Sequence, residues 1–254
     1  MSDPLTIPSA EPFFIPGGKT GCLLVHGFTG TPKEMRMLAD SLALERYTIL
    51  APRLAGHATT LSDMPATTWR HWLASVEDGL NLLKGCTTRQ VVMGLSMGGV
   101  LALLAAARYD VQAVAAFSAP CSLPPDPRAK LLPYITWLMP WVRKGEPDWW
   151  NLEAQKDHVD YPAYPSPSIL QLKKLIDVMV GELPQVKVPA FFVQSRQDHG
   201  IPPHSMDTLF AGVSSVDKTR MWVQNSGHVV IREPEREKIF TELKKFLRRA
   251  VADK

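Results

Sequence analysis

The sequence predicts an α/β fold in which a mostly parallel central sheet is flanked by helices. Two observations lead to this prediction. Short apolar runs rich in Val, Leu, Ile and Phe alternate along the chain with stretches of helical length and spacing. The apolar runs are nearly continuous in hydrophobicity rather than alternating, which is typical of strands that are covered on both faces.

The order of elements follows from these runs. Strands are expected at residues 21–27, 47–53, 90–94, 111–119, 189–195 and 218–225. Helices are expected at about residues 31–43, 67–84, 96–108, 168–180 and 233–250. At the start of the first helix, Thr31, Pro32 and Glu34 occupy the N-cap, N1 and N3 positions of a capping box.

Residues 121–167 interrupt the alternation. They show no clear strand, are rich in proline and carry Trp137, Trp141, Trp149 and Trp150, four of the seven tryptophans. An insertion at this point of a parallel sheet lies over the carboxyl ends of the strands, where open α/β folds bind ligands. We therefore expect a core formed by residues 1–120 and 168–254 and a small helical cap formed by residues 121–167. A packing appendage without a ligand is the alternative.

The composition limits the class of protein. The chain has 254 residues, 45% of them apolar and 21% charged, as in ordinary soluble globular proteins. Its 28 Lys and Arg against 25 Asp and Glu form no basic cluster interleaved with aromatic residues, so no nucleic-acid partner is expected. The longest apolar run, VLALLAAA, is too short to cross a bilayer, and the N-terminus lacks a signal-peptide pattern. Three widely spaced cysteines fit a reducing compartment rather than a zinc site, which predicts a cytoplasmic protein without stable membrane insertion.

One motif stands between a predicted strand and a predicted helix. The segment from Gly94 to Gly98 reads G-x-S-x-G, with Ser96 at its centre. A serine held on a tight, strained turn lifts its hydroxyl above the sheet edge, and the positions two residues before and after it then have room only for glycine. The N–H of Met97, at the start of the helix, suits a developing oxyanion. An ordinary Gly-Ser turn is the alternative.

A second donor is expected after the first strong strand. In the segment HGFTG, the N–H of Phe28 can point to the same place as that of Met97, which together form an oxyanion hole. His26 is expected to brace this loop by hydrogen bonds rather than to take part in catalysis. His57, in LAGHATT, either lines the site or has a structural role.

A serine nucleophile needs a base, and the base needs an acid that orients it. His228 follows the last predicted strand and Asp198 follows the strand before it, so both lie at carboxyl ends. Asp207, within a helix, and Asp217, ahead of a strand, are the competing acids. His228 must be neutral to act as a base. If its pKa is that of an ordinary histidine, activity is expected to fall below pH about 6 to 7.

Five segments carry a resemblance to a known family: LLVHGFTGTPKEM, PRLAGHA, VVMGLSMGGVLAL, RQDHGIPP and NSGHVV. The chain resembles the α/β-hydrolase superfamily, and within it the small bacterial carboxylesterases and monoacylglycerol lipases with a short helical cap. The resemblance covers nearly the whole chain and implies that Ser96 is the nucleophile, Asp198 the acid and His228 the base, with the N–H groups of Phe28 and Met97 as oxyanion hole. The chain departs from the family at Ser195 and Ala58, where glycine is usual.

These observations predict a serine carboxylesterase that hydrolyses short- to medium-chain acyl esters, with monoacylglycerols as one candidate class. The substrate is a small ester with an apolar acyl chain, and neither a metal nor an organic cofactor is required. The expected walls of the acyl pocket are cap residues Leu131, Trp137, Leu138 and Trp141. Acyl transfer, perhydrolysis or C–C hydrolysis by the same three residues is an alternative, and a non-catalytic binding protein with a capped pocket is a further one.

Overall fold

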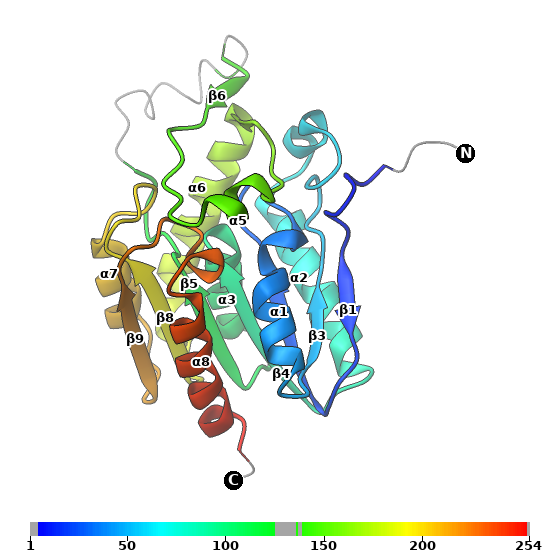
Figure 1. Cartoon of the computed structure of the whole chain (residues 1–254), viewed down its shortest axis with the longest axis vertical. Coiled ribbons are helices and arrows are strands. Elements are labelled where there is room, and N and C mark those ends of the chain that lie inside the picture. Colours follow the sequence, from blue (N-terminus) through cyan, green and yellow to red (C-terminus); the bar gives the residue numbers. More distant parts are fainter. Residues whose placement is uncertain (1–4, 125–135, 137–138, 253–254) are drawn as a thin grey trace.

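The apolar runs form a seven-stranded sheet in this computed structural model, which describes residues 5–124, 136 and 139–252. The strand order is β1-β3-β2-β4-β5-β8-β9, and all neighbours are parallel except β1, which is antiparallel to β3 (Figure 1). The strands are β1 (Phe13–Ile15), β2 (Thr20–Val25), β3 (Thr48–Ala51), β4 (Arg89–Leu95), β5 (Ala113–Phe117), β8 (Ala190–Ser195) and β9 (Lys218–Val223). The predicted fold class is confirmed, and each of the six expected strands is present.

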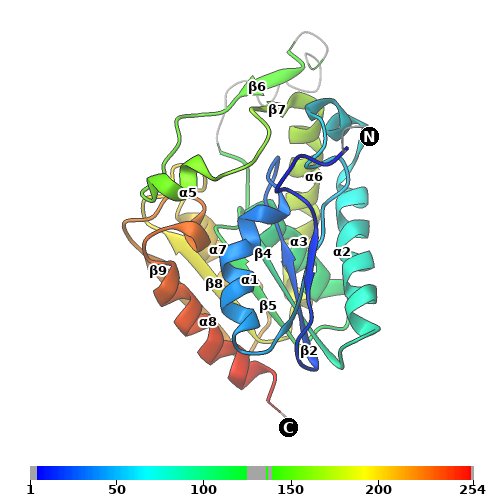
Figure 2. The same cartoon turned by 45° about the vertical axis from the view of Figure 1, so that its right-hand side comes forward.

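Helices cover both faces of the sheet (Figures 1 and 2). The α-helices are α1 (Arg36–Ala43), α2 (Trp69–Lys84), α3 (Met97–Arg108), α5 (Leu152–Lys156), α6 (Ser166–Glu182), α7 (His204–Gly212) and α8 (Arg236–Ala250). Short 3₁₀ helices lie at Pro32–Met35, Leu61–Ala66, Leu183–Gln185 and Val230–Arg232. None of the described helices is long and apolar enough to cross a bilayer.

The core consists of two apolar clusters, one on each side of the sheet. Along β4, Val91 and Met93 are buried with α1 and α8, whereas Val92 is buried with α2, α3 and α6. Adjacent residues of one strand therefore face different clusters. This explains why the strands read as continuous rather than alternating apolar runs.

Three short strands, β1, β6 (Trp141–Arg143) and β7 (Ala163–Pro165), were not expected from the sequence. Strand β1 was not expected, because it is a three-residue edge strand in which Phe14 is exposed. The cap contains a two-stranded antiparallel sheet of β6 and β7, although no strand was expected there. Each of these strands is too short to show a period along the sequence.

The predicted capping box at Thr31 is also absent. The Thr31 hydroxyl donates to the Val159 carbonyl, 3.0 Å away, and Glu34 Oε2 accepts from the Gly27 N–H at 2.7 Å. The side chains of Thr31 and Glu34 thus form hydrogen bonds with distant parts of the chain instead of capping the helix. Pro32 does stand at the start of the turn, as expected.

Candidate active site

Four loops converge at one edge of the sheet. They follow β2, β4, β8 and β9, which are parallel and therefore end on the same side. The described part of residues 121–167, the expected cap, lies at this end of the molecule, opposite the C-terminus (Figure 2). The loops carry Phe28, Ser96, Asp198 and His228, so the topology gathers the residues that the sequence singled out.

Ser96 occupies a strained turn between β4 and α3. Its backbone has φ 55° and ψ −120°, a conformation that costs a non-glycine residue about 1–3 kcal/mol. A Cβ atom on Gly94 would lie 2.0 Å from the Gly98 carbonyl oxygen, and one on Gly98 would lie 2.0 Å from the oxygen of Val25. Both glycines are therefore required for space, as the motif predicts.

Asp198 and His228 form a hydrogen-bonded pair. The His228 Nδ1 donates to Asp198 Oδ2 at 2.9 Å, while Asp198 Oδ1 accepts from the N–H groups of Gly200 (2.8 Å) and Ile201 (2.9 Å). The carboxylate is fully buried, whereas the His228 side chain is 25% exposed. Because Nδ1 is engaged by the acid, Nε2 is the nitrogen that remains to accept a proton.

The surroundings of His228 change its proton affinity. Burial of the ring opposes protonation, but the charge of Asp198 and the hydrogen bond to it favour the imidazolium. The negative charges of Asp148 and Glu34 act in the same direction, and the pKa of His228 rises to about 9. This shift predicts that the acid limb of activity lies at a higher pH than the 6 to 7 expected of an ordinary histidine.

The Phe28 turn passes directly beside the serine. It is closed by a hydrogen bond of 3.2 Å from the Gly30 N–H to the Gly27 carbonyl, and a Cβ atom on Gly27 would lie 3.5 Å from that of Ser96. Within the described part of the chain, neither the Phe28 N–H nor the Met97 N–H donates a hydrogen bond. Both donors are thus available for an oxyanion next to Ser96.

The two nearby histidines have structural surroundings. His26 is fully buried, its Nδ1 donates to the Gly27 carbonyl at 3.0 Å, and its Nε2 accepts from the Leu54 N–H at 3.2 Å. Burial, with a contribution from the nearby His57, holds the pKa of His26 well below its usual value. Burial lowers the pKa of His57 to about 4, and its ring packs 5.8 Å from that of Trp72. His26 therefore braces the loop as expected, and the His57 ring packs against the His26 ring at 5.1 Å.

The competing acids lie elsewhere. Asp207 in α7 forms an ion pair of 2.7 Å with Arg220, and Asp217 forms one of 2.9 Å with Arg249. Each of these carboxylates is occupied by an arginine, whereas Asp198 binds His228.

Ser195, one of the departures from the family pattern, connects the acid loop to the base loop. Its buried hydroxyl donates to the Ser226 carbonyl and accepts from the Gln197 N–H at 3.0 Å. The Gln197 side chain in turn accepts from the Asn225 N–H at 2.5 Å. A glycine at position 195 has no hydroxyl for these contacts. The second departure, Ala58, has a φ of 55°, a conformation that favours the glycine usual there.

Residues 148–161, which we call the strap, fasten the cap to these loops. Asp148 Oδ2 accepts from the backbone N–H groups of both His228 and His199, each at 3.0 Å. The fully buried Glu233 accepts from the N–H groups of Trp150 (3.2 Å) and Asn151 (2.8 Å). The start of the strap is thus bound to the loops of the acid and the base.

The end of the strap binds the other side of the site. The Tyr161 N–H donates to the Thr29 carbonyl at 3.0 Å, next to Phe28. The Tyr161 hydroxyl donates to the Gly56 carbonyl and accepts from the Thr59 N–H, both at 3.0 Å. Neither Asp148 nor Tyr161 was predicted from the sequence, because polar residues in an aperiodic insertion carry no signal of their distant partners.

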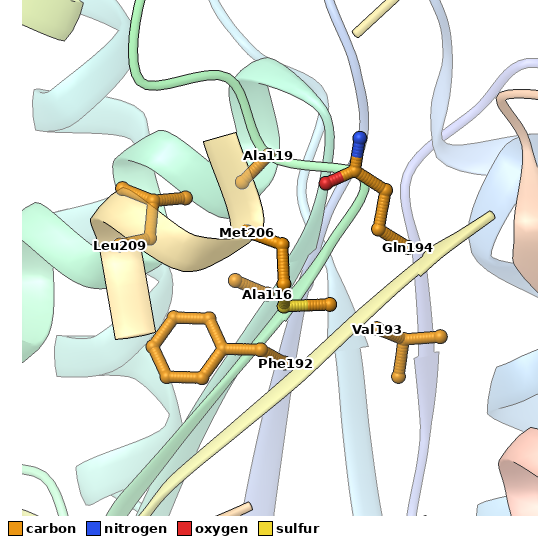
Figure 3. A pocket seen from close by; sticks show the side chains of 7 residues that line it. All are labelled: Ala116, Ala119, Phe192, Val193, Gln194, Met206 and Leu209. Carbon is orange, nitrogen blue, oxygen red and sulfur yellow. The ribbon is translucent and has the colours of Figure 1, made fainter. Parts of the chain in front are cut away.

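The acyl wall expected in the cap lies mainly outside the described residues. Three of the four residues, Leu131, Trp137 and Leu138, lie outside the described residues. The fourth, Trp141, lies in β6 and is 42% exposed. A cavity of about 10 Å³ lies between β5, β8 and α7. Figure 3 shows the side chains that line it. The cavity is lined by Ala116, Ala119, Phe192, Val193, Gln194, Met206 and Leu209. This volume suits about one water molecule and is too small for an acyl chain.

A larger groove, of about 450 Å³, lies between β1, β3 and α2 and includes none of the site residues. Among the described residues, no cluster of three or more His, Cys, Asp or Glu side chains could hold a metal ion.

Comparison with known proteins identifies the family. A model described as "Alpha/beta hydrolase family" matches residues 22–237. The chain belongs to the alpha/beta hydrolase family. Its relatives in this family include the thermostable monoacylglycerol lipase of Bacillus sp. (strain H-257), 37% identical over 88% of each chain, and the carboxylesterase of Bacillus subtilis (strain 168), 27% identical over 96% of this chain and 98% of the other.

One solved structure has a similar fold. It comes from work on LipS and LipT, two metagenome-derived lipolytic enzymes, and superimposes with a TM-score of 0.90 at 32% identity. The match covers 96% of this chain and 99% of the other.

Proposed function

We propose that this chain is a serine hydrolase that cleaves carboxylic esters, with Ser96 as nucleophile, His228 as base and Asp198 as orienting acid. The observation that carries the proposal is the 2.9 Å hydrogen bond between His228 and Asp198 at the sheet edge where Ser96 lies on its strained turn. The names of the two Bacillus relatives, a monoacylglycerol lipase and a carboxylesterase, support the same reaction class.

The proposed mechanism uses each group once in each half of the reaction. His228 Nε2 takes the proton of the Ser96 hydroxyl while Ser96 Oγ attacks the ester carbonyl carbon. The N–H groups of Phe28 and Met97 donate to the resulting oxyanion, and one such donor is typically worth about 3 kcal/mol of transition-state stabilisation. The imidazolium then protonates the leaving alcohol as the carbon–oxygen bond breaks.

Water completes the turnover. It attacks the acyl-enzyme carbonyl while His228 takes one of its protons, and the imidazolium returns that proton to the Ser96 oxygen as the carboxylic acid leaves. Asp198 remains ionised throughout, because its role is to hold the imidazole in the required tautomer and to stabilise the imidazolium.

For the substrate, we propose short- to medium-chain acyl esters bound under the cap, residues 121–167. Leu131, Trp137, Leu138 and Trp141 are the proposed acyl wall. Monoacylglycerols are included because the relative from strain H-257 is named for them. The cytoplasmic location expected from the cysteines remains a prediction.

The test is hydrolysis of p-nitrophenyl esters from C2 to C16, followed by monoacylglycerols. We expect turnover to be fastest with short to medium chains, and Ser96→Ala to lower kcat by about 10⁶-fold while the circular dichroism spectrum is unchanged. A steep preference for the longest chains would refute the proposed chain length. Turnover by the Ser96→Ala protein would refute the proposed mechanism.

A further inference from the structure

Asp148 is a cap residue that binds the backbone of the base. Its Oδ2 accepts from the His228 N–H and from the His199 N–H, both at 3.0 Å. His199 directly follows the acid Asp198, so one carboxylate oxygen joins the two loops that must keep the acid and the base in register. An ionised acceptor makes these hydrogen bonds stronger than those of a neutral acceptor.

The fit of Asp148 against the base loop is close. A Cβ atom on Gly227 would lie 2.2 Å from the Asp148 carbonyl oxygen and 2.5 Å from Asp148 Oδ1. The Gly227 N–H donates to the Glu233 carboxylate at 3.1 Å, and the same carboxylate accepts from the Trp150 N–H of the strap. The glycine that precedes His228 in the NSGH segment is thus explained by the room that Asp148 occupies.

Three carboxylates act on the imidazole of His228. Asp198 binds its Nδ1, Asp148 binds its backbone N–H, and Glu34 contributes from the 3₁₀ turn beside the Phe28 loop. Asp198 is the proposed orienting acid, and Glu34 holds the Gly27 N–H of the oxyanion loop. Asp148 is therefore the member of this set that acts on His228 from the cap.

We propose that Asp148 is a positioning residue for the base: its carboxylate fixes the His228 loop against the acid loop, and its charge stabilises the imidazolium that forms when Ser96 is deprotonated. This inference rests on the proposed ester hydrolysis. It makes the cap a part of the catalytic arrangement as well as a cover over the substrate.

The two roles of the carboxylate can be separated by substitution. Asp148→Asn keeps the size and one acceptor oxygen but removes the charge, whereas Asp148→Ala removes both. Glu146→Gln is the matched control, because Glu146 is an exposed carboxylate two residues away on the same segment. The full-length variants are assayed with p-nitrophenyl butyrate from pH 5 to 10, and active sites are counted with a fluorophosphonate.

We expect Asp148→Ala to lower kcat per active site by about ten- to a hundredfold, as a displaced catalytic group does. Asp148→Asn should retain kcat within about threefold of wild type, because its amide oxygen can still accept from the two backbone N–H groups and keep the base in place. In both variants, the acid limb of the kcat/KM profile should move to lower pH, since the imidazolium loses a stabilising charge. Glu146→Gln should match wild type in kcat and in the position of the limb.

An acid limb at the wild-type position in both Asp148 variants would overturn the inference, because a purely structural role changes the amount of active protein and not this limb. A wild-type kcat in Asp148→Ala would overturn the positioning role. If Asp148→Ala does not fold, the limb of Asp148→Asn decides.

A measurement that does not need activity separates this inference from the proposed function. An NMR titration of the His228 ring should give a lower pKa in Asp148→Asn than in wild type, and an equal pKa in Glu146→Gln. A wild-type protein that neither hydrolyses esters nor reacts with the fluorophosphonate contradicts the proposed function alone. An unchanged His228 pKa in Asp148→Asn contradicts the role of Asp148 alone.

Discussion

The sheet and the strap hold the two halves of the site by different forces. Ser96 is fixed by β4 and α3, whose side chains are buried in two apolar clusters. The loops of His228 and Phe28 are fixed from above by the strap, through carboxylates, a tyrosine hydroxyl and backbone hydrogen bonds. The nucleophile therefore depends on apolar packing, whereas the base and the oxyanion loop depend also on polar contacts that respond to pH and to single hydrogen bonds.

The largest effect is expected in the packed half. Gly98→Ala places a methyl group 2.0 Å from the Val25 carbonyl oxygen and 2.6 Å from that of His26. Both oxygens belong to the backbone, so they cannot move aside locally. We expect the free energy of unfolding, measured in urea, to fall by about 3 kcal/mol. Gly181→Ala is the control: it lies in α6 with nothing within 4 Å of the new atom, and a helical Gly-to-Ala change should stabilise by about 1 kcal/mol. Equal stability of the two variants would contradict a tightly packed elbow.

The next effect comes from the charges around the base. Because His228 acts only when neutral and its pKa is raised to about 9, kcat/KM should fall about tenfold for each pH unit below about 9. The same pKa shift makes the protein more stable at low pH, where its activity is lowest. The folded-state pKa exceeds the unfolded value, so this group stabilises the fold fully below pH 6.5 and loses that contribution as the pH rises through about 9. A kcat/KM profile that is level from pH 6 to 9 would contradict this electrostatic account.

A smaller effect tests a single fastening of the strap. Tyr161→Phe removes the hydroxyl that binds Gly56 and Thr59, which should lower the free energy of unfolding by about 1–2 kcal/mol. Amide hydrogen exchange should become faster at residues 59 and 161 and stay unchanged in β4. Tyr109→Phe is the control, because its hydroxyl binds Glu77 at the surface. The strap is not held as described if the two variants behave alike.

The smallest effect concerns backbone strain away from both regions. Arg46 is exposed and has φ 62°, shortly after the end of α1 at the opposite edge of the sheet from the site. Arg46→Gly should stabilise the protein by up to about 1 kcal/mol and leave kcat unchanged. Strain at Ser96, with φ 55°, is part of the site, whereas strain at Arg46 has no such use. Thermal unfolding measures the difference, and a lowered Tm in Arg46→Gly would count against it.

The same contrast explains what the sequence could predict. The strands in the middle of the sheet, β2, β4, β5 and β8, are buried and read as apolar runs. Ser96, Asp198 and His228 each follow a parallel strand, which predicted that they lie at the same edge of the sheet. The three-residue strands β1, β6 and β7 have no period to detect. Asp148 contacts a residue 80 positions away, so only the folded chain could connect it with His228.

The capping box illustrates the limit of local patterns. Thr31 and Glu34 have the right identities and spacing, yet their side chains bind Val159 and Gly27 instead. The raised pKa of His228 is a similar case, since two of the three carboxylates that raise it, those of Asp148 and Glu34, lie far from it in sequence.

The most direct test of the central claim is to locate the covalent adduct. Wild-type protein is treated with a fluorophosphonate, digested, and the modified peptide is identified by mass spectrometry. We predict one adduct on Ser96, absent from Ser96→Ala and formed much more slowly in His228→Ala, because the serine then lacks its base. An adduct on another residue, or labelling of Ser96 at the same rate without His228, would contradict the proposed nucleophile and base.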